Sequence, residues 1–116
     1  MAIAGVAIAV VAAATAVFFD INKATLTQKD KARLQVYAES MKNADATFSV
    51  AGYADKKTGT PKINQTLSEK RAKAVYDYLI SLGIPASKME TSAHGGVDPI
   101  FFNNDVLSRT VIIKAK

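Results

Sequence analysis

Short segments with the two-residue period of a β-strand alternate along this chain with longer segments that have the period of a helix. This alternation restricts the fold more than any other feature. Strands are predicted at residues 17–21, 47–53, 89–94 and 106–114, and helices at residues 27–43 and 64–82. The order β-α-β-α-β-β predicts an α+β two-layer sandwich, a mixed sheet with both helices packed on one face. Part of the strand pairing is expected to be parallel, and the last pair can be antiparallel.

Local signals mark the ends of the two predicted helices. Thr27 and Asp30 have the spacing of a capping box, with Asp in place of the usual Glu, and predict the start of the first helix. Gly83 and Pro85 predict the end of the second. Residues 54–62 and 95–99 contain Gly, Pro and Asp, and are predicted to be loops. The apolar stripes that face the core are expected to be Leu34, Tyr37, Ala38 and Met41, and Ala72, Val75, Leu79 and Leu82.

Charge is distributed unevenly along the chain. Residues 1–19 carry none, whereas the 15 Lys and Arg and the 10 Asp and Glu all follow from Asp20 onward. Residues 1–16 are open to three interpretations: an apolar leader or membrane segment, a lead-in strand, or a cloning remnant. Ala14 and Ala16 give the small-x-small pattern of a signal-peptide cleavage site without the usual preceding Lys or Arg. The chain of 116 residues leaves room for one domain, at residues 17–116.

Composition excludes several classes of function. There is no cysteine, and His94 is the single histidine, so thiolate sites and a histidine-based zinc site or triad are not expected. No pair of carboxylates has the pattern of a general acid and base, so we predict no enzyme, no cofactor and no metal. The net charge of +5 favours an anionic partner. Tyr76 and Tyr78 lie on a helix without a basic stripe, which argues against nucleic acid.

Asp55, Asn64 and Arg71 form the most unusual polar group in the sequence. Asp55 directly follows the second predicted strand, where open sheets often place binding residues. Arg71 falls about 40° from Val75 around the helix, at the edge of the apolar stripe, and Asn64 lies two turns earlier on nearly the same face. A guanidinium at that position needs an anion. Two alternatives remain open: a plain Asp55–Arg71 ion pair that fastens the loop to the helix, or a ligand carboxylate held bidentately by Arg71.

These residues belong to a longer pattern. It runs Gly52-Tyr53-Ala54-Asp55, then Thr58-Gly59, then Asn64-Gln65-Thr66-Leu67-Ser68-Glu69-Lys70-Arg71-Ala72. The pattern resembles the signature of the OmpA-like peptidoglycan-binding domain family, roughly G-[HY]-[TA]-D, a Gly-containing loop, and N-x-x-L-S-x-x-R-A. Residues 17–26 resemble the family's opening and residues 108–111 its closing N-R-R-V strand, so the resemblance covers about residues 17–116. The variants look most like forms found in the Bacteroides group of bacteria.

The resemblance implies a ligand site. Asp55 would bind the ammonium and Arg71 the carboxylate at the end of the diaminopimelate side chain in the peptidoglycan stem peptide. Asn64 would line the same pocket, and the loop at Thr58 and Gly59 would supply backbone groups. The loop between Asp55 and Asn64 is one residue longer than in many members of the family, which bears on ligand preference.

The resemblance also implies a role. It is a non-enzymatic anchor to peptidoglycan in the periplasm, associated with the outer membrane. The alternative is an envelope protein–protein interaction module of the same fold that does not bind the cell wall. Membrane attachment is expected through residues 1–19 or through an N-terminal barrel outside this sequence. Ser108 and Thr110 replace an Asn and an Arg of the family, so any ligand contact of the closing strand is expected to differ.

Overall fold

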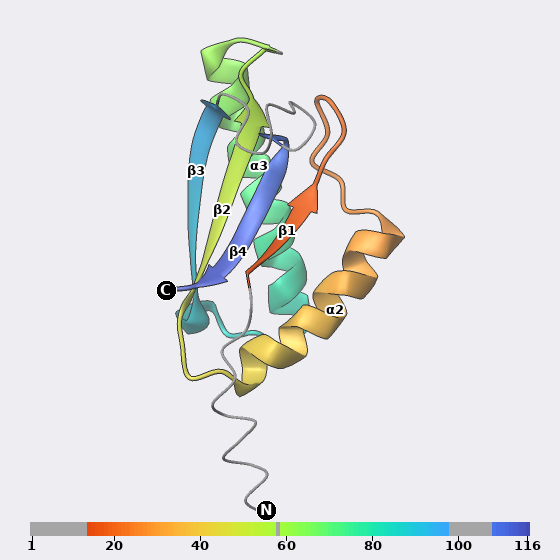
Figure 1. The fold of residues 1–116 in the computed structure, drawn as a ribbon, viewed down its shortest axis with the longest axis vertical. Coiled ribbons are helices and arrows are strands. Elements are labelled where there is room, and N and C mark those ends of the chain that lie inside the picture. Colours follow the sequence, from red (N-terminus) through yellow and green to blue (C-terminus); the bar gives the residue numbers. More distant parts are fainter. Residues whose placement is uncertain (1–13, 58, 98–107) are drawn as a thin grey trace, which may run out of the picture.

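The computed structural model describes residues 14–57, 59–97 and 108–116. In these residues, four strands and two α-helices follow one another in the predicted order, with a short 3-10 helix before the third strand (Figure 1). None of the described helices is both long and apolar enough to span a bilayer. The elements are β1 (Thr15–Phe18), α2 (Gln28–Asn43), β2 (Phe48–Asp55), α3 (Pro61–Ser81), η1 (Ala86–Lys88), β3 (Met89–Val97) and β4 (Thr110–Ala115).

The strands form one mixed sheet in the order β1-β4-β2-β3. β2 and β3 pair in parallel, with Phe48 opposite Met89. β4 lies between β1 and β2 and is antiparallel to both, so that Val111 is opposite Val17 on one side and Gly52 on the other. The last two strands of the chain are therefore not paired with each other. The partly parallel sheet is confirmed, but the antiparallel partners of β4 are β1 and β2.

Both helices pack on one face of this sheet, as predicted (Figure 1). The buried apolar positions Leu34, Ala38 and Met41 of α2 are three or four residues apart, whereas the fully buried apolar side chains of the central strands are two residues apart, at Phe48 and Val50 and at Val111 and Ile113. Tyr37 and Leu82, which were expected in the stripes, are only half-buried at the edge of the core. The fully buried centre consists of Leu34, Met41, Phe48, Val50, Val75, Leu79, Val111 and Ile113.

Each helix begins at a threonine cap. The predicted capping box of α2 is present: Asp30 N donates to Thr27 Oγ1 at 3.1 Å, and Thr27 N donates to Asp30 Oδ2 at 2.9 Å. Helix α3 begins at Pro61, about one turn before the predicted start. Thr60 caps it by accepting a hydrogen bond from Ile63 N at 3.2 Å. The segment assigned to a loop thus contains the Thr-Pro start of the longest described helix.

The first strand lies earlier than predicted. β1 ends at Phe18, and Thr15 and Ala16, which lie in the segment with three open interpretations, pair with β4. Arg33 Nη2 also donates to the carbonyl of Ala16 at 2.9 Å, which ties β1 to α2. Residues 1–13 and 106–107, on which other predictions fall, lie outside the described residues.

The parallel strand pair is longer than predicted. β2 continues through Asp55 and β3 through Val97, where loops were expected, because Ala54 pairs with Gly96 and Asp55 with Val97. An irregularity in register lies between Gly52 and Ala54. The extension places Asp55 inside the sheet, at the carboxyl end of β2, and not in a free loop.

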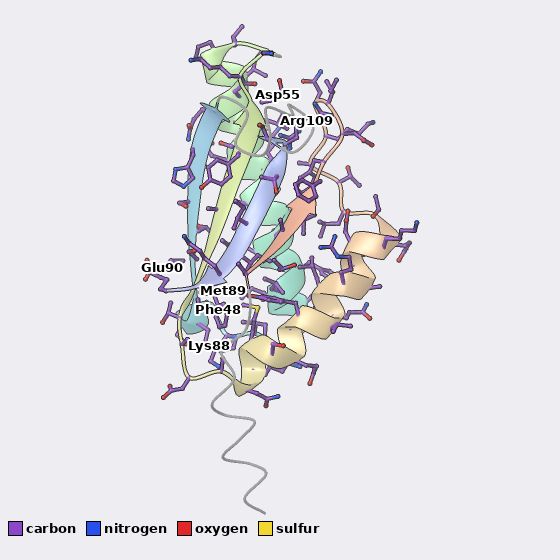
Figure 2. All side chains as sticks on the ribbon, in the orientation of Figure 1. Phe48, Asp55, Lys88, Met89, Glu90 and Arg109 are labelled. Carbon is purple, nitrogen blue, oxygen red and sulfur yellow. The ribbon has the colours of Figure 1, made fainter. Side chains whose placement is uncertain are left out.

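Lys88 lies at the opposite end of the sheet from Asp55 (Figure 2). Its ammonium donates to the backbone carbonyls of Met41, Lys42 and Ala44, at 2.8, 3.3 and 2.7 Å. These carbonyls belong to the last turn of α2 and its cap, where no further helical N–H groups can reach them. Lys88 therefore serves as a side-chain cap for the carboxyl end of α2.

Candidate functional site

Helix α3 approaches β2 very closely at Gly52. A Cβ atom built on Gly52 would lie 2.1 Å from the carbonyl oxygen of Ser68 in α3, so any side chain there would push the helix away. Arg71 follows Ser68 by one turn, and Asp55 follows Gly52 by three residues. The glycine of the sequence pattern thus sets how near Arg71 comes to the end of β2.

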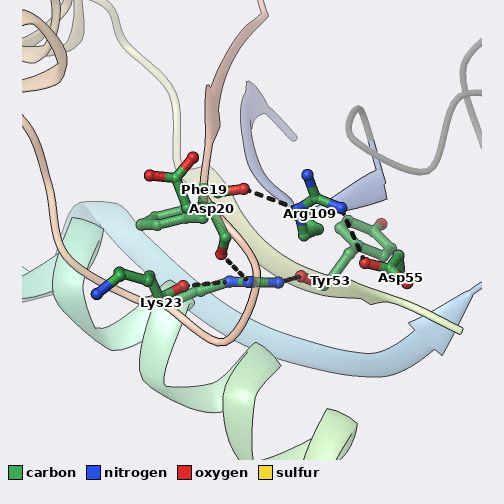
Figure 3. Close-up of polar contacts among 7 residues, drawn as sticks. Phe19, Asp20, Lys23, Tyr53, Asp55 and Arg109 are labelled. Carbon is green, nitrogen blue, oxygen red and sulfur yellow. Dashed lines mark hydrogen bonds and ion pairs between the residues drawn. The ribbon is translucent and has the colours of Figure 1, made fainter. Parts of the chain in front are cut away.

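Arg71 is completely buried, with no exposed surface. Its Nε donates to the carbonyl of Lys23 at 2.8 Å, and its two terminal nitrogens donate to the carbonyls of Tyr53 and Asp20, both at 3.0 Å (Figure 3). The guanidinium also lies over the ring of Phe19, 5.3 Å from its centroid. Arg71 therefore joins α3 to β2 and to the segment that follows β1.

Asp55 forms its ion pair with Arg109, just before β4. Arg109 Nη1 lies 3.1 Å from Asp55 Oδ2, and the side chains expose only 10% and 0% of their surface (Figure 3). Arg109 Nε donates to the carbonyl of Phe19 at 3.0 Å. A buried ion pair of this kind keeps a carboxylate charged in a place where it would otherwise be costly.

Among the described residues, Arg71, Arg109 and Asp55 form a buried cluster of two cations and one anion. Burial, and after it the Arg109 guanidinium, lower the pKa of Arg71, and Asp55 partly offsets both effects, so that the pKa is about 10. Arg71 still carries its charge at neutral pH, at a cost in free energy. An additional anion beside Arg71 would reduce that cost.

Asn64 lies at the start of α3 between two glycine-bearing segments. It is 3% exposed. A Cβ on Gly59 would come within 2.9 Å of its Oδ1, and a Cβ on Gly96 within 2.8 Å of its Nδ2. Gly59 has a φ of +75°, which favours glycine. A groove of about 300 Å3 opens here, lined by Lys56, Pro61, Asn64, Gln65, His94, Gly95 and Gly96.

The structure brings together most, but not all, of the predicted site. Asp55 and Arg71 enter the same charged cluster, but in the part of the chain that the structure describes they do not form the ion pair considered as the alternative. That alternative is wrong in its partner: Arg71 binds backbone carbonyls, and Asp55 binds Arg109. Asn64 and Gly59 lie side by side at the start of α3, whereas Thr58 lies outside the described residues.

Arg109 was missed as a site residue. Asp55 and Arg109 are 54 positions apart, and no local period joins them. The signal was available, because Arg109 matches an arginine of the family's closing N-R-R-V pattern. Its neighbours Ser108 and Thr110 differ from that pattern.

The described chain is a small two-layer α+β domain with a buried charged cluster at the carboxyl end of β2. In the described residues, no group of three or more His, Asp and Glu lies close enough to hold a metal ion. The chain belongs to the OmpA family, whose sequence profile matches residues 18–110.

Relatives and solved structures agree with this membership. The chain is 40% identical over 102 residues to outer membrane protein A of Klebsiella aerogenes, covering 84% of this chain and 29% of that protein. The match to outer membrane protein A of Escherichia fergusonii is also 40%, over 42% of that protein. The chain thus spans less than half the length of these curated relatives.

Among solved structures, the peptidoglycan-associated lipoprotein of Burkholderia pseudomallei superposes with a TM-score of 0.76 at 27% identity, covering 87% of this chain and 89% of that one. The OmpA-like domain of FopA1 from Francisella tularensis has a TM-score of 0.75 at 29% identity, covering 89% and 73%. The C-terminal domain of Helicobacter pylori MotB, at 21% identity and a TM-score of 0.75 over 88% and 84%, shares the fold.

Proposed function

We propose that this chain binds peptidoglycan non-covalently through the diaminopimelate of the stem peptide. It thereby anchors the outer membrane or an envelope protein to the cell wall, in the periplasm. Membership of the OmpA family and the likeness to a peptidoglycan-associated lipoprotein support this proposal. The observation that carries it is the buried Arg71–Arg109–Asp55 cluster, in which the described residues supply two cations and one anion.

The side chain of diaminopimelate ends in an ammonium and a carboxylate, and the cluster has groups for both. A guanidinium has five N–H donors, and Arg71 gives three of them to carbonyls of the described residues. Two N–H donors remain, enough for a carboxylate. One carboxylate oxygen of Asp55 accepts a hydrogen bond from Arg109. The ammonium would share Asp55 with Arg109.

Asn64 and the loop before α3 would hold the rest of the stem peptide. The groove beside Asn64 is open to solvent on the side of Lys56 and His94, which are exposed. Backbone groups at Gly59 and in the adjoining loop residue Thr58 would supply further hydrogen bonds. Binding of this kind requires no chemical step, so the proposed role is that of a non-enzymatic anchor.

One observation favours the second candidate, an envelope interaction module that does not bind the cell wall. All three acceptors of Arg71 and the ion-pair partner of Asp55 are internal to the domain. On this account the cluster only fastens β1, β2 and α3 together. The two candidates differ in the expected effect of Arg71→Lys. A lysine can still donate hydrogen bonds to backbone carbonyls, but it cannot bind a carboxylate through two parallel N–H groups.

Co-sedimentation with insoluble, diaminopimelate-containing peptidoglycan tests the proposal. Arg71→Lys and Asp55→Asn should each weaken binding by about tenfold or more, because each removes a charge-assisted hydrogen bond to the ligand. Lys73→Gln is the matched control: it removes one positive charge two residues from Arg71, at an exposed site, and should bind normally. Folded variants that bind like the original chain, or an original chain that does not bind, would support the interaction module instead.

A further inference from the structure

A second surface of α3 combines apolar and basic side chains: Lys62, Ile63 and Lys70 are exposed, and Leu67 is half-buried. Ile63 and Leu67 lie one turn apart, and Lys62 and Lys70 flank them along the helix. They border a groove of about 520 Å3, and none of its lining residues is acidic. We call this surface the α3 patch, and its lining residues are Asn22, Lys62, Ile63, Thr66, Leu67 and Lys70.

The α3 patch is separate from the charged cluster. The cluster side of α3 is buried, as Asn64, Ser68 and Arg71 are at most 3% exposed. Ile63, by contrast, exposes 51% of its surface. The first turn of α3 also contains no acidic residue that would offset the positive end of the helix dipole beside Lys62.

Asn22 reaches the patch from a turn that is held from inside the protein. Lys23 N donates to the carbonyl of Asp20 at 3.0 Å, and Asn22 has a φ of +59°. Arg71 donates to the carbonyls at both ends of this turn, those of Asp20 and Lys23. The wall of the groove is thus ordered in advance, and its formation needs no further ordering when a partner binds. Ile21, in the same turn, exposes 49% of its surface.

We propose that the α3 patch docks on an anionic phospholipid surface. Lysines complement the lipid phosphates, and Ile63 and Leu67 enter the boundary between head groups and acyl chains, which is how interfacial surfaces of this composition bind membranes. A free phosphate ion would use the lysines but gain nothing from the apolar side chains. The chain's net charge of +5 brings it toward such a surface, and the carboxylate-free patch determines which side faces it.

Vesicle co-sedimentation tests this docking surface. The full chain should bind vesicles of phosphatidylglycerol mixed with phosphatidylcholine, should not bind phosphatidylcholine alone, and should remain bound in millimolar inorganic phosphate. The double variant Lys62→Gln/Lys70→Gln should lose about twenty-five-fold in affinity, about fivefold for each lysine. Ile63→Ser should lose about fivefold, because less apolar surface enters the bilayer boundary.

Two controls separate the patch from general charge attraction. Lys42→Gln/Lys114→Gln removes the same charge from exposed sites outside the patch, and Ile80→Ser makes the same change farther along α3, where the side chain is 38% exposed. Both controls should bind vesicles nearly as the original chain does. Equal losses for patch and control variants would overturn the proposal. So would competition by phosphate, or self-association through Ile63 without vesicle binding, which would assign the groove to a second copy of the chain.

Discussion

Arg71 and Lys88 lie toward opposite ends of the domain, and each donates hydrogen bonds to three backbone carbonyls. Lys88 caps the last turn of α2, with Met41, Lys42 and Ala44 as acceptors. Arg71 holds the carbonyls of Asp20, Lys23 and Tyr53. In the first case all three N–H groups of the ammonium are used, whereas in the second only three of five are used.

The surroundings of the two cations differ as well. The acceptors of Lys88 are the negative end of a helix, which is a favourable place for a cation. Arg71 lies beside a second guanidinium, that of Arg109, and burial together with this neighbour lowers its pKa to about 10. Lys88 uses all of its N–H groups at a helix end, so its contacts are fully explained by a structural role. At the Arg71 end, two N–H donors remain and the described part of the cluster has two cations and one anion, which is the basis of the proposed anionic ligand.

The largest effect is expected for Arg71→Gln. The change leaves at least one of three buried carbonyls without a donor and empties the space over Phe19, so the free energy of unfolding should fall by about 3 kcal/mol or more. Urea unfolding measures the loss. A loss below about 1 kcal/mol would show that the hydrogen bonds of Arg71 contribute little to the stability of the fold. The comparison of Arg71 with Lys88 would then fail.

Arg109→Gln should have the next largest effect. It leaves Asp55 buried without its ion-pair partner, and the free energy of unfolding should fall by about 2 kcal/mol, less than for a fully buried pair because Arg109 keeps some exposure. The double variant Arg109→Gln/Asp55→Asn should recover part of this loss, since the uncompensated charge is gone. Strictly additive losses in this double-mutant cycle would contradict the coupling of the two residues.

Lys88→Met should cost about 1–2 kcal/mol of the free energy of unfolding. Lys88 is only half-buried, so water can reach some of the freed carbonyls of α2. Peptidoglycan binding by the folded variant should be unchanged. Arg71→Lys, in contrast, should reduce binding. If Lys88→Met also reduced binding when compared at equal folded fraction, the loss of binding would reflect lower stability and not a lost ligand contact.

The smallest effect is expected at the start of β1. A chain that begins at Val17 lacks two residues that pair with β4 and the carbonyl of Ala16 that accepts from Arg33. Compared with a chain that begins at Thr15, it should still fold but melt a few degrees lower, for a loss of about 1 kcal/mol. Thermal unfolding of both chains measures how much Thr15 and Ala16 contribute to stability. Loss of the cooperative transition would show that β1 is essential to the core.

The parts of the fold that the sequence predicts well are those set by neighbours along the chain. The capping box of Thr27 and Asp30, the α2 stripe containing Leu34 and the α3 stripe containing Val75 and Leu79 depend on spacings of three and four residues. The place of β4 between β1 and β2 depends on contacts between segments distant in sequence, which no local period encodes. The early start of α3 was missed because Thr60 and Pro61 signal a helix start as well as a loop.

The candidate site shows the same division. The position of Arg71 at the edge of the helix stripe correctly indicated that its side chain lies away from solvent. Its actual acceptors are backbone carbonyls, which a pattern of side chains does not reveal. Arg109 comes from the far end of the chain and joins Asp55 only because β4 lies beside β2. Residues on separate strands can be assigned to one site only when the order of the strands in the sheet is known.

Titration calorimetry of the original chain with two muropeptides tests the central claim most directly. The two differ only in the third residue of the stem peptide, diaminopimelate or lysine, and therefore in one carboxylate. If Arg71 supplies its two remaining N–H donors to that carboxylate, the diaminopimelate form should bind at least about tenfold more tightly, the worth of one charge-assisted contact. Equal affinity for both muropeptides, or binding of neither, would contradict the assignment of Asp55 and Arg71 as the ligand site.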